Sequence, residues 1–258
     1  MQNLKYVVFL IGILSIPFPL QASLEETIKE EVGGTKDKVY YPASLAHRSL
    51  ITPEQILEVG AVTHYRNVLN GPGVDFHFEG SYGFYRDMAA IAGIRTIAAS
   101  QPGSFKSGGM TVGALFRLLS EHLEYPETIV GLKLAALGYT EISENKGSPV
   151  LLMPSVKAKK GLTDAIAVTA ETVFGIGKEV GLVKLRGGGI SKLHPLFDAA
   201  LYAEWTNLGF PEPTAVTITP ALYYHFKQIL DLSAGVDIAL YGGSSIGNNL
   251  RLGVAAAF

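Results

Sequence analysis

The sequence predicts an all-β fold, a closed antiparallel up-and-down transmembrane β-barrel of about twelve strands. Two observations lead to it. Hydrophobic residues make up 48% of the chain and its mean hydropathy is +0.26, yet beyond the N-terminal segment no run of about eighteen apolar residues could cross a bilayer as a helix. Instead, one segment after another alternates apolar and polar residues. Because backbone amides in lipid must be paired within the protein, a closed barrel is the other way to span a membrane.

The clearest alternation lies in residues 229–258. Apolar residues recur at every second position, and Asp231 and Asp237 are among the residues between them. After a break rich in Gly, Ser and Asn, a second alternating stretch ends at Phe258. Period-two alternation is typical of a strand with one apolar and one wet face. A soluble β-sandwich would need a second sheet or helices over each apolar face, and the chain offers only more strands of this kind.

Residues 1–22 are interpreted as a secretory signal peptide and excluded from the fold. A mildly basic start precedes an apolar run at 6–16, which is too short to span a bilayer as a helix, and Ala22 offers a small residue for cleavage. The alternative is a retained membrane anchor, which Pro17 and Pro19 disfavour because they end the apolar run early.

Residues 23–52 are predicted to form a periplasmic lead-in, and the barrel is assigned to 53–258. Many charged residues and a glycine pair favour a solvated, partly helical or disordered lead-in. The alternative is that part of it, around Tyr40 and Leu45, packs against the barrel mouth or enters the lumen.

Six strands are predicted in the first half of the barrel. The clearest covers 74–84, where Val74 and Phe76 share a face and Asp75 and Glu79 lie on the other. The same alternation between turns rich in Gly, Pro, Ser or Asn predicts strands at 55–65, 89–98, 112–118, 130–136 and 152–159.

Six more strands are predicted at 166–174, 179–186, 197–205, 216–226, 229–240 and 250–258. The stretch 179–186 has the least regular pattern and is assigned mainly because its neighbours need a partner. A long turn is expected over 187–195. Because proline removes a ladder donor, a bulge or kink is expected at Pro220.

An even number of strands places the start of the first strand and the end of the last strand on the same side of the membrane, which we assign as periplasmic. Tight turns such as those at Lys160 and Lys227 then face the periplasm. The opposite links face outside, around Gly71, Pro102, Asn145, Pro211 and Gly242. Outward aromatic residues near strand ends are predicted to form the interfacial girdles, namely Tyr65, Phe84, Trp205, Tyr224 and Phe226.

The polar face of the strands is predicted to line a pore. Its members are Glu58, His64, Asp75, His77, Glu79, Arg95, Arg117, Lys133, Lys157, Glu171, Asp198, Glu204, Asp231, Asp237 and Arg251. Because these charges have mixed signs, we expect ion pairs and a channel, or a plugged barrel, with little charge preference. Strand geometry separates Asp75 from Glu79 by about 13 Å, so these two and His77 could not chelate one ion.

The composition and motifs exclude several other functions. The chain has no cysteine, and therefore neither a disulfide framework nor a thiolate metal site, and its net charge of -2 is too balanced for a nucleic-acid groove. The Ser/His pairs at 47–49 and 191–194 do not resemble the pattern of outer-membrane lipases. We therefore predict no enzyme activity, no catalytic residue, no metal and no cofactor.

The whole pattern resembles the bacterial outer-membrane β-barrels. In that class a final strand ending in a C-terminal aromatic residue is the signal that the assembly machinery reads, which implies this role for Phe258. The stretches TITPALYYHF (217–226) and 231–258 resemble the family named for the MetA pathway of phenol degradation, a family of outer-membrane transporters. The resemblance implies passage of small molecules, apolar or aromatic among them, across the outer membrane of a Gram-negative bacterium, with lipid and the assembly machinery as partners. The oligomeric state and the substrate stay open.

Two other functions remain open at this point. One is a structural or adhesive barrel with an occluded lumen, which conductance measurements distinguish from a channel. The other is a barrel enzyme with lipase or deacylase activity, which would require an activity that disappears when one Ser or His is replaced.

Overall fold

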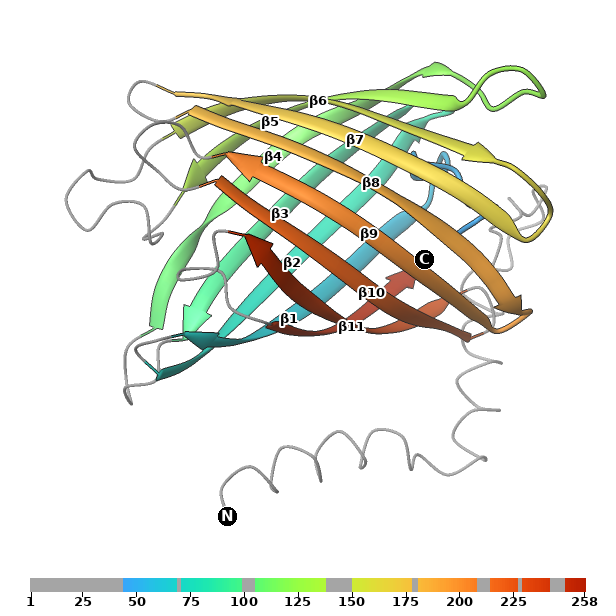
Figure 1. The fold of residues 1–258 in the computed structure, drawn as a ribbon. Helices are drawn as coiled ribbons and strands as arrows, with labels where there is room; N and C mark the ends of the chain where they lie inside the picture. The colour runs from blue at the N-terminus through green and yellow to red at the C-terminus, as the bar shows by residue number, and fades with distance from the viewer. Residues whose placement is uncertain are drawn as a thin grey trace, which may run out of the picture. The chain divides into compact units, whose positions relative to one another are not determined.

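The described part of the chain is one closed barrel. The computed structural model describes residues 44–68, 71–98, 105–137, 150–177, 181–207, 214–226, 229–241 and 249–258, all within the compact unit Tyr41–Phe258. Twelve strands pair antiparallel with their neighbours in sequence, and the first pairs with the last (Figure 1). The predicted closed barrel of twelve strands is therefore confirmed. The predicted signal peptide and most of the predicted lead-in lie outside the described residues.

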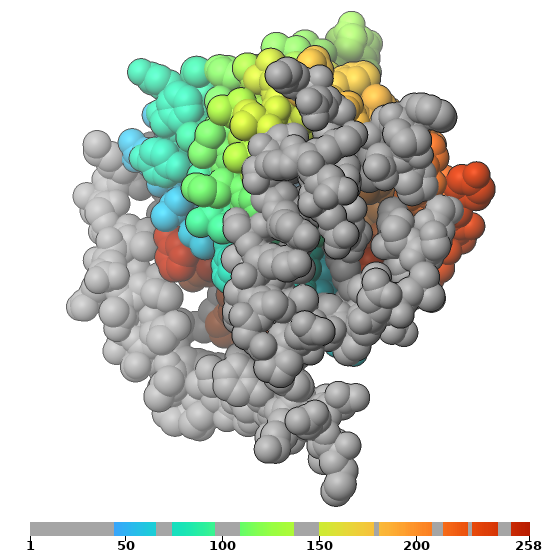
Figure 2. All heavy atoms as spheres, turned by 90° about the vertical axis from the view of Figure 1, so that its left-hand side faces the viewer, coloured from blue at the N-terminus to red at the C-terminus, as the bar shows by residue number. Residues whose placement is uncertain are grey.

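The strands are β1 (Leu57–Val68), β2 (Gly71–Tyr85), β3 (Met88–Ala98), β4 (Phe105–Leu119), β5 (Glu127–Leu137), β6 (Val150–Gly161), β7 (Ile166–Ile176), β8 (Gly181–His194), β9 (Phe197–Asn207), β10 (Thr214–Phe226), β11 (Leu230–Tyr241) and β12 (Asn249–Ala257). We call the end where β1 begins and β12 ends the turn end, and the opposite end the loop end. Seen from the loop end, the strand colours follow the sequence around the barrel until blue meets red (Figure 2). Among the described residues, no helix is long and apolar enough to cross a membrane.

The outer face of the wall is apolar. Large hydrophobic side chains such as Leu134, Leu201 and Leu222 are half exposed along the strands. Of the outward side chains that the structure describes on these strands, only Lys160 is charged. It lies one residue from the end of β6, and its ammonium donates to the carbonyl oxygens of His122, Leu123 and Tyr125 in the β4–β5 turn. This distribution is the one that a hydrocarbon environment requires of a barrel wall.

The seam between β1 and β12 closes the sheet. Their ladder runs from Glu58 opposite Ala257 to Arg66 opposite Asn249. At the turn end, Leu57 and Phe258 exchange two backbone hydrogen bonds of 2.9 Å each. Phe258 is thus tied to the first strand, and its role in assembly stays a prediction.

The turn predicted at 187–195 is wrong, because β8 continues through it to His194. Glycines at 187–189 hide the alternation, since they carry no side chain to show which face is apolar. Gly188 faces inward, where a Cβ would overlap the ring of Tyr202 and the carbonyl oxygen of Leu201. The Arg186 guanidinium then lies over that ring, 4.1 Å from its centroid. A bare backbone at this point therefore allows β8 to pass close to a large inward side chain of β9.

The irregularity expected at Pro220 takes a different form. The β10–β11 ladder passes from the Ile218 pair to the Ala221 pair in the same register, without a pair at Pro220, whereas β9 pairs with Pro220 as usual. The register shift lies between Val216 and Thr217. The missing amide hydrogen therefore interrupts the ladder on one side of the strand and adds no residue to it.

The two faces of β11 give a direct test of the membrane-spanning assignment. Arginine at Val236, which faces outward, should lower the free energy of unfolding in lipid by about 2–4 kcal/mol, because the charge would lie in hydrocarbon. Arginine at Ser233, which faces inward, should cost clearly less. Urea titration of both variants in lipid vesicles measures the difference, and equal losses would contradict the assignment.

Candidate functional site

The inner face of the barrel carries the charged residues that the sequence selects. The fifteen predicted pore-lining residues all share the inward position of buried Asp75, Asp198 and Asp231 on their strands. The Lys133 ammonium on β5 lies 3.6 Å from a carboxylate oxygen of Glu79 on β2, and two strands separate β5 from β2. Such a contact can form only inside the barrel. That these residues line a conducting pore stays a prediction.

Ion pairs join many of these side chains across the strands. The pairs, with the distance from a side-chain nitrogen to a carboxylate oxygen, are Arg95 with Asp75 (2.8 Å), Arg117 with Glu127 (3.1 Å), Lys184 with Glu204 (2.8 Å) and Arg251 with Asp237 (3.2 Å). The members of the Asp75, His77 and Glu79 triplet diverge, since Asp75 bonds Arg95 and Glu79 faces Lys133. Among the described residues, no group of three His, Cys, Asp or Glu side chains could hold a metal ion.

Residues 44–52, which we call the luminal segment, lie inside the barrel at its turn end. Ala46 is buried against Ala167 on β7 and Ile190 on β8, in a cluster that also includes residues of β9. Ile51 is buried against Ala89 on β3 and Ile129 on β5. The segment thus touches walls on opposite sides of the lumen. These contacts favour the alternative weighed for the lead-in, in which part of it enters the lumen.

One side of the luminal segment is held by a cluster of buried carboxylates. The Ser44 hydroxyl and the Leu45 amide donate to Asp198 on β9, at 3.0 and 2.6 Å. The Arg48 guanidinium forms a two-point contact with Asp231 on β11, one bond of which measures 2.9 Å. His225 on β10 is fully buried between the two, with Nε2 3.1 Å from Asp198 and Nδ1 2.7 Å from Asp231.

The other side of the segment is held from β4, β5 and β6. The Lys159 ammonium donates to the backbone carbonyl of Arg48. The Ser49 hydroxyl and the Leu50 amide donate to the Glu127 carboxylate, the latter at 2.8 Å. Because buried polar groups are costly unless they are paired, these contacts fix both the position and the direction of the segment.

The sequence signal for this cluster is weak. Glu127 begins β5, Lys159 lies near the end of β6, and His225 follows two tyrosines near the end of β10. Each alternates as an ordinary lumen residue does, so nothing in the pattern shows that they converge. Lys159 is predicted to face inward, whereas Lys184, Arg186 and Lys192 are missed, because they lie in the irregular and glycine-rich part of β8.

A tight crossing leads the chain from the luminal segment into β1. The Thr52 hydroxyl donates to the Glu58 carboxylate at 2.8 Å, and Gln55 has a left-handed backbone conformation, with φ of 64°. The crossing runs directly over Gly83 on β2, where a Cβ would overlap the backbone of Thr52 and Pro53. Glycine at this position is therefore a condition for the segment to reach the lumen.

Replacement of Gly83 should expel the luminal segment. In Gly83→Val the added side chain would displace Pro53, so trypsin should cleave after Arg48 in the folded barrel, a bond that the lumen shields in the unaltered chain. Mass spectrometry of the fragment that begins at Ser49 measures this. Gly80→Val is the matched control, because a Cβ there comes no closer than 3.7 Å to Glu58. Equal cleavage in both variants would contradict the packing.

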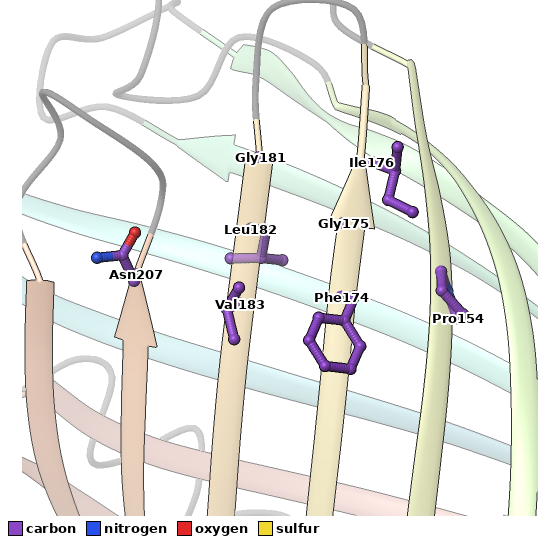
Figure 3. A pocket seen from close by; sticks show the side chains of 8 residues that line it. All are labelled: Pro154, Phe174, Gly175, Ile176, Gly181, Leu182, Val183 and Asn207. Atoms are coloured by element: carbon purple, nitrogen blue, oxygen red, sulfur yellow. The ribbon is translucent and has the colours of Figure 1, made fainter.

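The outer wall also carries an open hollow of about 390 Å³ over β6–β9. Phe174, Ile176, Val183 and Pro154 line it, and Leu182 appears behind the β8 ribbon (Figure 3). Asn207 is the one polar side chain among its lining residues. A surface of this composition suits lipid chains and offers no convergent polar groups for chemistry.

The closed wall, apolar outside and charged inside, defines the class: the chain has the fold of the porins of the Gram-negative outer membrane. Solved structures of this fold include the KdgM porin (12% identity, TM-score 0.59, 78% of this chain and 99% of that chain covered) and the NanC porin (12%, 0.59, 77% and 98%). An outer membrane channel from Pseudomonas putida F1 is similar too (12%, 0.60, 87% and 100%). No family model and no curated protein matches the chain. At these identities the likeness shows the fold alone.

Proposed function

We propose that the protein is a passive channel for small molecules in the outer membrane of a Gram-negative bacterium. The observation that carries the proposal is the division of the wall: an apolar outer face suited to lipid and an inner face lined with paired charges. Solved proteins of the same fold are described as porins and as an outer membrane channel, which supports it.

The solute is a finer proposal. The resemblance to the MetA-pathway family implies small apolar or aromatic molecules. The inner face, with ion pairs such as Lys184 with Glu204 and Arg251 with Asp237, suits small polar molecules and their water. Polar solutes are therefore the first to test.

The luminal segment favours one competing function, a structural barrel with an occluded lumen. It touches β3, β5, β7 and β8 with buried apolar side chains and β9 and β11 with polar ones. In the channel interpretation the same segment is a plug that reduces conductance at the turn end. The two functions differ in what happens when the segment is released.

Loss of two carboxylates should open the channel. In Asp198→Asn with Asp231→Asn, the contacts to Ser44 and Arg48 weaken, because a neutral amide oxygen is a weaker acceptor than a carboxylate and cannot balance the guanidinium charge. We expect single-channel conductance in planar bilayers to rise at least about threefold, since the plug then leaves the lumen more often. Asp164→Asn, at an exposed turn outside the lumen, is the control for loss of charge.

Uptake of a neutral polyol, erythritol, into proteoliposomes complements the conductance. Flux through the unaltered chain that rises in the double variant supports a plugged channel. Absence of both conductance and flux in the double variant, with the barrel folded, would favour the structural barrel.

A further inference from the structure

The charges of the inner face are separated by sign around the barrel. In β3–β8, which we call the basic half, the described inward side chains are eight cations, Arg95, Arg117, Lys133, Lys157, Lys159, Lys184, Arg186 and Lys192, against two anions, Glu127 and Glu171, a net charge of +6. In β9–β12 with β1 and β2, the acidic half, they are seven anions, Glu58, Asp75, Glu79, Asp198, Glu204, Asp231 and Asp237, against one cation, Arg251, a net charge of −6 with histidines neutral.

Two ion pairs between the halves lie at the boundaries, where β2 meets β3 and β8 meets β9, and a third spans two strands. Arg95 on β3 pairs with Asp75 on β2, and Lys184 on β8 pairs with Glu204 on β9. Lys133 reaches Glu79 past the bare backbone of Gly113, whose missing Cβ would lie 3.1 Å from the lysine Cγ. Away from the boundaries, like charges gather on each side, so the inner face has a polarity directed across the lumen. Walls of low dielectric strengthen such a field.

The contacts of Arg48 in the luminal segment follow the same polarity. Its guanidinium bonds Asp231 in the acidic half, and its carbonyl oxygen accepts from the Lys159 ammonium in the basic half. The positive end and the electron-rich end of one residue thus point to opposite walls. A small molecule with a cationic and an anionic end would meet the same pair of walls.

We propose that the lumen selects small zwitterions, with an ammonium or guanidinium group turned to the acidic half and a carboxylate turned to the basic half. The two halves cancel in total, so neither cations nor anions as such are favoured. A solute that carries both charges is stabilised at both walls, whereas a solute with one charge is attracted by one wall alone. The inference rests on the proposed channel function and names its substrate class.

The test compares four solutes of similar size in proteoliposomes that contain the full chain. They are γ-aminobutyrate as the zwitterion, γ-aminobutyramide as the cation, N-acetyl-γ-aminobutyrate as the anion and erythritol as the neutral reference. We expect the zwitterion to enter about fivefold faster than either singly charged solute, an effect of the size expected for one close charge contact in a water-filled lumen. Equal rates, or faster passage of a singly charged solute, would overturn the proposal.

Charge swaps across the boundaries test the cause. The test variant carries two swapped pairs, Glu79→Lys with Lys133→Glu and Lys184→Glu with Glu204→Lys. The swaps keep the total charge of the inner face. Each swapped pair moves two charge units from one half to the other, so the net charges of the halves fall from +6 and −6 to +2 and −2. The zwitterion preference should fall to about onefold, since little transverse field remains. Arg86→Glu with Asp164→Arg, at exposed turns outside the lumen, is the control that should keep it.

Erythritol separates the outcomes. If erythritol enters neither through the unaltered chain nor through Asp198→Asn with Asp231→Asn, the channel function and this inference both fail; if it enters without a zwitterion preference, this inference alone fails. If the swapped barrel does not assemble, the near-isosteric Glu58→Gln with Lys157→Gln, one charge from each half, replaces it. An undiminished preference in that variant would then count against the proposal.

Discussion

Closure of the sheet is the constraint on which this structure depends. In hydrocarbon an unpaired backbone amide costs several kcal/mol, so both edges of every strand must find a partner. The β1–β12 ladder meets this demand, and the hydrogen bonds between Leu57 and Phe258 extend it to the turn end. Once the sheet is closed, each strand has one face toward lipid and one toward the lumen. Every charged side chain in mid-strand must then point inward, whatever else it does there.

That constraint explains why many charged side chains lie in the lumen and why they pair with one another there. Charges that cannot leave the inner face are balanced there by neighbours, as in the row formed by Lys157, Glu171, Arg186 and Glu204 on four successive strands. The luminal segment binds to the same charged side chains, because its amides and its Arg48 contact carboxylates that face inward. The luminal segment and the charged inner face of the wall therefore form one polar network.

Much of the fold follows from the sequence, because period-two alternation reports both the strand and its face. The pattern around Val74 and Phe76 or around Val236 gives each strand and its inward residues without any long-range information. It fails at 187–195, where glycines carry no pattern, and at 44–52, whose contacts are with strands far away in the sequence. The alternation pattern also does not predict the separation of charge by sign, since this separation depends on which strands face each other after the sheet has closed.

The position of the luminal segment also limits the order in which the protein can be assembled. The segment precedes β1 in the chain, yet Asp198 and Asp231, its main partners, lie on β9 and β11. The polar contacts of Ser44 and Arg48 can form only when β9 and β11 have joined the sheet, whereas Glu127 and Lys159 lie on the preceding strands β5 and β6. The segment can therefore contact one wall of the lumen before the opposite wall is complete. Full docking of the segment is thus coupled to the addition of the last strands to the sheet.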